Sequence, residues 1–149
     1  MGSEMCIRDR HVADAHDGYD YDHDPEHRAK DFIGRWQDVP AEHLIKCAMG
    51  LTHLQADGVR FYLPAAMIWV IKNFRDSDSM LVDWTIYQLA ADRDDPNLSQ
   101  RFDRRFGLFN PAQRSACRSF LKFLLSEDPD GDFIDATVAA EALAEEWTN

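Results

Sequence analysis

Phe61-Tyr62-Leu63-Pro64-Ala65-Ala66-Met67-Ile68-Trp69-Val70-Ile71 is an unbroken run of eleven apolar residues, and it lies between Arg60 and Lys72. Pro64 suits the first turn of a helix, where its missing N–H would have no partner. The residues that follow are apolar on every face of a helix, which is typical of a helix enclosed by others. The run is too short for a bilayer, because a membrane span needs about 18 or more apolar residues. We therefore predict a buried central helix over residues 63–74.

The rest of the chain also has helical patterning. Apolar residues recur every three or four positions over residues 41–54, 80–89, 111–126 and 134–147, and a short helix is expected within residues 98–109. Asn110, Pro111 and Gln113 fit a helix start with a capping box. No segment alternates apolar and polar residues as a half-buried strand does. The sequence predicts an all-α, compact, single-domain bundle of about five to seven helices around the central helix.

The segment before the central helix is expected to be non-helical. Gly58 is predicted to end the helix over residues 41–54, because glycine is common just after a helix C-terminus. Residues 59–62 would then form a short extended entry to the central helix.

The composition is that of an acidic globular protein. Of the 149 residues, 45% are hydrophobic, and the formal net charge is −11. Acids are concentrated at both ends: residues 11–31 hold seven acids and two bases, and residues 126–149 hold eight acids and no base. Nucleic acids and anionic membranes are bound by clustered lysine and arginine, so the charge disfavours both as partners.

The first ten residues are excluded from the fold. Gly2 to Arg10 resemble the translation of an adapter used in sequencing-library preparation, so residues 1–10 are expected to be an artefact. The predicted organisation is then a helical domain over residues 11–126, truncated at its N-terminus, and an acidic C-terminal helix over residues 127–149. Cys47 and Cys117 have no C-x-x-C spacing and are expected to be buried free thiols of a cytoplasmic protein.

Asp57-Gly58-Val59-Arg60-Phe61-Tyr62-Leu63-Pro64-Ala65 resembles the signature of a bacterial family of unknown function, domain of unknown function 6714. Trp36-Gln37-Asp38-Val39-Pro40 is similar to the tryptophan-then-proline element of that family, and Phe120-Leu121-Lys122-Phe123-Leu124 is similar to its closing motif. The resemblance covers residues 11–125. It implies a helical fold and a bacterial origin, and it supplies no catalytic residues.

Arg60 and Tyr62 are the first candidate binding residues. They precede the expected first turn of the central helix, whose positive dipole end could receive an anion. The alternative is structural: Tyr62 buries its ring and hydrogen-bonds through its hydroxyl, while Arg60 pairs with a surface acid such as Asp57.

The second candidate is a basic stripe formed by Arg114, Arg118 and Lys122, at spacing i, i+4 and i+8 on the helix over residues 111–126. Together with arginines nearby in sequence, the basic stripe could contact phosphates. A contact with the acidic C-terminal helix is favoured, because a partner in the same chain is at high effective concentration. The nearby arginines are Arg101, Arg104 and Arg105, and the acids of the C-terminal helix are Glu141, Glu145 and Glu146.

No metal or cofactor is predicted. Histidine and aspartate alternate between His11 and Asp24, but their spacing fits no closed metal site, and a solvated acidic segment explains them. Residues 126–132 resemble a calcium loop only in part, since Ser126 and Thr137 stand where the first ligand and the bidentate glutamate belong. A Pro-Asp-Gly turn before a helix is a sufficient explanation.

These observations favour a non-enzymatic helical module that binds another protein, as an acidic antitoxin-like or accessory subunit. The sequence has no Walker A, G-x-G-x-x-G, G-x-S-x-G or H-E-x-x-H motif. The alternative is a small enzyme or ligand-binding domain with an anion site at Arg60 and Tyr62. A cytoplasmic location is expected, without a membrane or nucleic-acid partner.

Overall fold

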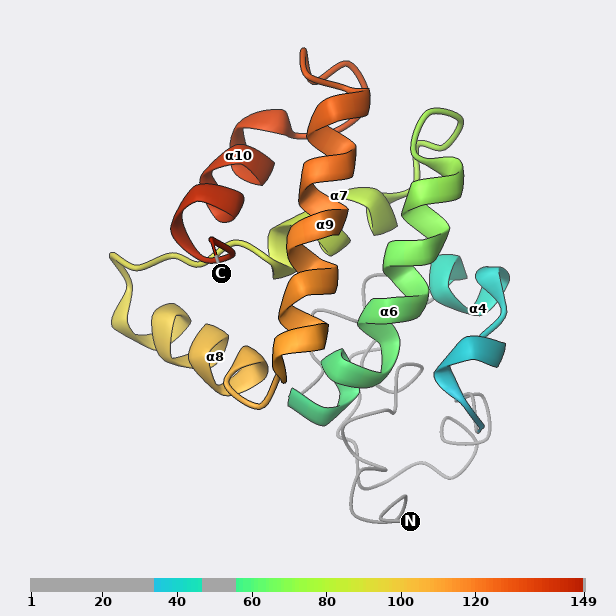
Figure 1. Ribbon diagram of the computed structural model, residues 1–149. Coiled ribbons are helices and arrows are strands. Elements are labelled where there is room, and N and C mark those ends of the chain that lie inside the picture. Colours follow the sequence, from blue (N-terminus) through green and yellow to red (C-terminus); the bar gives the residue numbers. More distant parts are fainter. Residues whose placement is uncertain (1–33, 47–55, 149) are drawn as a thin grey trace. The chain divides into compact units, whose positions relative to one another are not determined.

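The structure is a computed structural model that describes residues 34–46 and 56–148. Within these residues the chain forms six α-helices and one turn of 3-10 helix, with no strand (Figure 1). The all-α class predicted from the sequence is confirmed. The sequence predicts one bundle, and the chain divides into two compact units, residues 1–68 and residues 69–149, with the division inside a helix.

The first unit contains the 3-10 turn η2 (Trp36–Asp38), α4 (Ala41–Lys46) and the first part of α6 (Ala56–Asn73). The helix predicted over residues 41–54 is described only as far as Lys46, and the remainder lies outside the described residues. The second unit contains the end of α6 and four further helices. These are α7 (Met80–Gln88), α8 (Pro96–Phe106), α9 (Pro111–Glu127) and α10 (Ala136–Glu145).

Helix α6 begins at Ala56, seven residues or about two turns before the predicted start at residue 63. The predictions that Gly58 ends a helix and that residues 59–62 are extended are therefore wrong. Pro64 lies inside the helix, not in its first turn. A proline in a helix interior removes one backbone hydrogen bond and costs about 3 kcal/mol. Burial of apolar side chains on both sides of the proline offsets this cost, and that contribution is not visible in local sequence signals.

Helix α6 is buried on one face, so the prediction of a helix buried on every face is wrong. Ile68 and Ile71 are 44% and 39% exposed. The eleven-residue apolar run offers no polar face from which the exposed side could have been read. The buried residues recur every three or four positions and are Val59, Tyr62, Leu63, Ala66, Met67, Val70 and Phe74.

Side-chain caps set the starts of α7, α8 and α9. The Ser79 hydroxyl accepts a hydrogen bond from Leu81 N at 3.1 Å, and Asp95 caps α8 directly before Pro96. At α9, Asn110 and Gln113 make both bonds of the predicted capping box, at 2.8 and 2.9 Å. Each cap satisfies backbone N–H groups that have no partner inside the helix.

The core of the second unit lies where α10 packs on α9 and α7. Helix α10 presents Ala139 and Ala142, both buried, and small side chains allow close packing of helices. Helix α9 contributes the four apolar residues predicted for its buried face, Cys117, Phe120, Leu121 and Leu124. None of the described helices is both long enough and apolar enough to cross a bilayer.

Candidate functional site

Arg60 and Tyr62 lie in the second turn of α6, because the helix begins at Ala56. They do not precede the first turn, which is the placement that the predicted anion site requires. Tyr62 is fully buried, and Arg60 is half-buried. The Tyr62 ring stacks on His43 of α4 with 6.1 Å between ring centroids, and Phe61 meets it edge-on at 4.9 Å. Tyr62 therefore contributes packing to the first unit, and anion binding at these residues stays a prediction.

The basic stripe has a different environment at each residue. The Arg114 guanidinium lies 4.8 Å from the centroid of the Trp147 ring and donates a 3.2 Å hydrogen bond to the Glu146 carbonyl oxygen. Arg118 is half-buried and Lys122 is exposed. The prediction is a contact between the basic stripe and the acids of the C-terminal helix. Arg114 instead contacts the Trp147 ring and the Glu146 backbone, both after the end of α10.

The arginines of α8 also differ in exposure. Arg101 and Arg104 are exposed, whereas Arg105 is half-buried and donates a hydrogen bond to the side chain of Gln88 on α7. Arg105 therefore does not extend into solvent as Arg101 and Arg104 do. Its side chain links α8 to α7.

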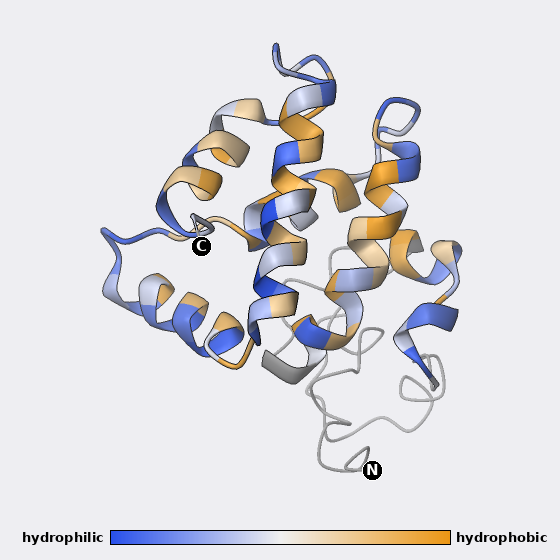
Figure 2. Cartoon of the chain, in the orientation of Figure 1, coloured by the Kyte–Doolittle hydropathy of each residue, from blue (hydrophilic) through white to orange (hydrophobic). Residues whose placement is uncertain are grey.

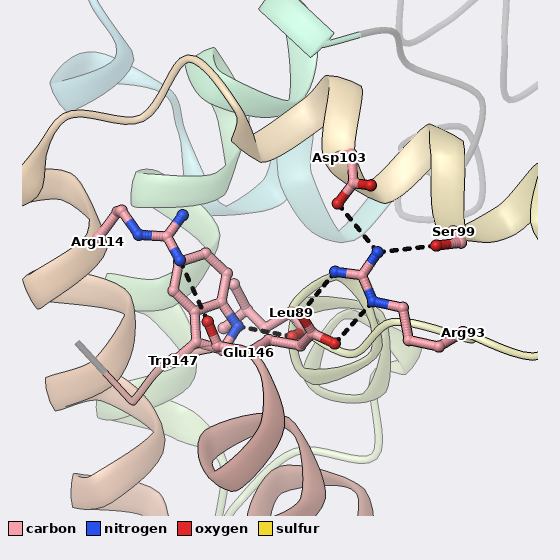
Figure 3. A network of polar contacts seen from close by, with 7 residues as sticks. All are labelled: Leu89, Arg93, Ser99, Asp103, Arg114, Glu146 and Trp147. Atoms are coloured by element: carbon pink, nitrogen blue, oxygen red, sulfur yellow. Dashed lines mark hydrogen bonds and ion pairs between the residues drawn. The ribbon is translucent and has the colours of Figure 1, made fainter.

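Arg93, in the loop between α7 and α8, joins three segments of the second unit (Figure 3). Its Nε and Nη2 donate to the two carboxylate oxygens of Glu146, at 3.0 and 2.6 Å. Its Nη1 donates to Ser99 Oγ and Asp103 Oδ1 of α8, at 2.8 and 3.0 Å. The hydrogen bonds to Glu146 and Asp103 raise the pKa of Arg93, so the guanidinium stays charged. A bidentate pair of this kind fixes orientation as well as distance.

Trp147 anchors the segment that follows α10. It is 1% exposed, and its indole N–H donates a 2.7 Å hydrogen bond to the Leu89 carbonyl oxygen at the end of α7. The rings of Phe106 and Phe102 on α8 meet the Trp147 ring edge-on, with 5.2 and 6.2 Å between ring centroids. Together with Arg93, these contacts attach α8 and the C-terminal segment to each other (Figure 3). This cluster is therefore structural.

Helix α7 exposes one narrow face, formed by Met80, Asp83 and Tyr87, which we call the outer face of α7. Residues spaced by three, four and seven positions lie on the same side of a helix. Met80 and Tyr87 are 48% and 47% exposed, and they lie about 10 Å apart along the helix axis. The rest of the helix is buried through Leu81, Val82, Trp84, Thr85 and Ile86.

The turn before α10 borders the outer face of α7. The Tyr87 hydroxyl donates a 2.9 Å hydrogen bond to Asp135, the N-cap of α10. This bond to a carboxylate raises the pKa of Tyr87. Phe133, two residues before Asp135, is 51% exposed, and its ring meets Phe74 edge-on with 6.3 Å between centroids. A third large apolar side chain is thus exposed in the turn that the Tyr87 hydroxyl contacts.

Asp128 holds that turn in shape. Its carboxylate is buried and accepts hydrogen bonds from the backbone N–H groups of Asp132, Phe133 and Ile134, at 2.9, 2.8 and 2.9 Å. Burial alone would raise the pKa of Asp128, but the three hydrogen bonds outweigh burial and the pKa lies below its ordinary value. Gly131 has φ of 73°, a conformation that favours glycine. The Asp128 carboxylate, which a calcium loop would need as a ligand, is occupied by these hydrogen bonds within the turn.

Exposed carboxylates occur on the outer face of α7 and in two connections, one that precedes α7 in sequence and one that Tyr87 contacts through Asp135. These connections are the loop over residues 74–79 and the turn over residues 128–135. Arg75 of the loop pairs at 2.7 Å with Glu127, the last residue of α9, directly before the turn. Figure 2 shows much of both connections in the hydrophilic colour. We call these two connections the acidic loops. The exposed acids of the acidic loops and the outer face are Asp76, Asp78, Asp83, Asp130 and Asp132.

Cys117 is a buried free thiol, as predicted, and burial raises its pKa to about 12. Cys47 and the histidine-rich segment over residues 11–24 lie outside the described residues. In residues 34–46 and 56–148, no group of three or more histidine, cysteine, aspartate or glutamate residues is placed to hold a metal ion.

Sequence reasoning missed Arg93 and the outer face of α7. Arg93 and Glu146 are 53 residues apart, so no local spacing connects them. The helical spacing over residues 80–89 does not show which of its many apolar side chains face outward. The only local signal was Asp83 between Met80 and Tyr87, because a charged side chain in a helix normally marks the exposed side.

A protein-family model described as "Family of unknown function (DUF6714)" matches residues 1–149. The match extends beyond residues 11–125, over which the resemblance was read from the sequence. Comparison with curated proteins and comparison with solved structures gave no match.

Proposed function

The chain belongs to the DUF6714 family, and we propose that it is a non-enzymatic helical module that acts by binding another protein. The observation that best supports this is the outer face of α7. Met80 and Tyr87 are held about half exposed on a helix whose other sides are buried. Exposed apolar side chains grouped on a rigid element are typical of protein–protein interfaces, where tyrosine and methionine are enriched.

The charged groups of the second unit support a binding role over acid–base chemistry. Arg93 ties α8 to the C-terminal segment, Asp128 shapes the turn before α10, and Asp135 caps α10 while it accepts from Tyr87. Each of these side chains is engaged in holding a loop or a helix end in place.

An antitoxin-like or accessory role in a bacterial cytoplasm is the finer part of the proposal. The net charge of −11 favours fast association with a basic partner and opposes self-association. The free thiol of Cys117 fits a reducing compartment.

Affinity capture of the tagged full-length protein from cells of its source organism, followed by mass spectrometry, tests the proposal. We expect one protein recovered in near-equimolar amount and absent from a parallel capture with an unrelated acidic protein carrying the same tag. Native mass spectrometry that finds only a bound small molecule, with no protein partner, would contradict it.

A further inference from the structure

We infer that the outer face of α7 docks a basic amphipathic helix of the partner protein. The inference rests on the proposed function, and it adds the place of binding and the chemistry of the partner. The docking surface is a side of α7 that the described part of the chain leaves uncovered.

The spacing of the exposed apolar side chains suits a helix. Met80 and Tyr87 are two turns apart on α7, and a partner helix that uses apolar anchors at i and i+7 has the same separation. Phe133 belongs to the turn that the Tyr87 hydroxyl contacts, since it precedes Asp135 by two residues. The face therefore offers apolar contact along α7 and at one edge.

The negative charge around the outer face of α7 favours a partner helix that carries positive charge. Asp83 stands between the two apolar residues, and the acidic loops add four further exposed carboxylates. The bases closest in sequence to this face are Arg75 and Arg93, and both already pair with carboxylates. Arg75 pairs with Glu127 at 2.7 Å, and Arg93 pairs with Glu146 at 2.6 Å. A partner helix with lysine or arginine flanking its apolar stripe would meet opposite charge along its length.

The same charges disfavour the other possible occupants. A second copy of the chain would bring an identical acidic face against this one in a two-fold dimer, and like charges would repel. An anionic membrane would be repelled for the same reason. A basic helix from a different protein is the occupant that satisfies both the apolar and the charged groups.

Binding of a synthetic peptide to the full-length protein tests the inference. The probe is a fluorescent amphipathic helical peptide of leucine and lysine, about 18 residues or five turns long. A peptide with glutamate in place of every lysine is its matched control. We expect the lysine peptide to bind in a fluorescence-anisotropy titration, to lose affinity as salt is raised, and to bind at least ten times more tightly than the glutamate peptide.

Matched variants locate the site. Met80→Ser is expected to weaken the lysine peptide tenfold or more, whereas Leu98→Ser is expected to change Kd less than twofold. Leu98 is 42% exposed on α8 and so provides a control of similar exposure. The double variant Asp78→Asn, Asp83→Asn is expected to weaken binding, and Glu141→Gln, Glu145→Gln, which removes the same charge from α10, is not.

Three results would overturn the inference: equal binding of both peptides, equal effects of Met80→Ser and Leu98→Ser, or a dimer of the free protein that Met80→Ser abolishes. The result of the capture experiment separates the two proposals. If the cellular partner is captured equally by wild type and by Met80→Ser, the docking site is wrong and the protein-binding function stands. If no protein is captured at all, the function itself is wrong.

Discussion

Trp147 is the side chain on which the C-terminal segment depends. It is buried among Phe102, Phe106 and Arg114, and its N–H bonds to the Leu89 carbonyl oxygen. Removing a buried tryptophan side chain leaves a large cavity, so Trp147→Ala should lower the free energy of unfolding by about 3–5 kcal/mol. Urea unfolding followed by far-UV circular dichroism measures this change.

Trp147→Phe separates packing from hydrogen bonding. It keeps an aromatic ring in the cluster and loses only the indole donor, so its cost should be clearly smaller than that of Trp147→Ala. A Trp147→Ala variant as stable as wild type would mean that the C-terminal segment is not anchored as described.

Asp128 should make stability depend on pH. Its folded-state pKa lies below the ordinary aspartate value because three backbone N–H groups bind the carboxylate. A lowered folded-state pKa gives stability that is present above the unfolded-state pKa, about 3.9, and is lost as pH falls through the folded-state value. Asp128→Asn should therefore be less stable than wild type at neutral pH, with the difference shrinking in acid.

Thermal unfolding of wild type and Asp128→Asn between neutral and acid pH measures that difference. Asp130→Asn changes an exposed carboxylate in the same turn and serves as the control. A constant gap between wild type and Asp128→Asn at every pH would show that the carboxylate is not the cause.

Cys117 should be unreactive in the folded protein. Thiolates are the reactive form, and burial raises the pKa of Cys117 to about 12. In a Cys6→Ser, Cys47→Ser background, Ellman's reagent at mildly alkaline pH should modify Cys117 only after denaturant is added. Rapid modification without denaturant would show that the buried face of α9 is open to solvent.

Helix α9 is the element whose start should be most sensitive to a single cap. Asn110 accepts from Gln113 N, and the Gln113 side chain accepts from Asn110 N. Losing an N-cap side chain costs about 1 kcal/mol, so Asn110→Ala should lower the free energy of unfolding by that amount in urea titration. Asn110→Asp retains the acceptor and should cost less; equal losses for the two variants would contradict the role of the cap.

The elements that sequence reasoning predicted well are those with local signals. The start of α9 was predicted because Asn110, Pro111 and Gln113 lie within four residues, and its buried face followed from helical spacing. The start of α6 was not predicted, because Gly58 and Pro64 both favour a boundary in local terms. The helix continues through both residues because the side chains on either side of the proline are buried, and their burial depends on the rest of the fold.

The candidate site was less predictable than the helices. Tyr62 belongs to the central apolar run, but the prediction that it precedes the first turn of the helix is wrong, because the helix starts at Ala56. The outer face of α7 depends on which side of the helix packs inward. That choice is made by α10, which is distant in sequence, and Met80 and Tyr87 look like core residues when read alone.

At the scale of the whole molecule, the net charge of −11 should limit stability at low salt. Excess like charge repels itself in a folded chain, and added ions screen that repulsion. We expect Tm to rise when potassium chloride is raised from about 0.02 to about 0.3 M, a change in screening length of roughly threefold or more. Differential scanning calorimetry measures Tm.

A variant in which four exposed acids are replaced by their amides is the control for this prediction. Its Tm should depend less on salt than that of wild type. A wild-type Tm that falls with added salt would mean that attractive pairs, such as Arg75 with Glu127, outweigh the net repulsion.

The Arg93 guanidinium, in the loop after α7, donates hydrogen bonds to two residues of α8 and to the acid that follows α10. A lysine has a single ammonium group and cannot reproduce that geometry. Positions 93, 103 and 146 are therefore expected to covary among family members. Family members that lack the arginine at the first position are expected to have exchanged both acids as well, and such correlated replacement can be read directly from an alignment.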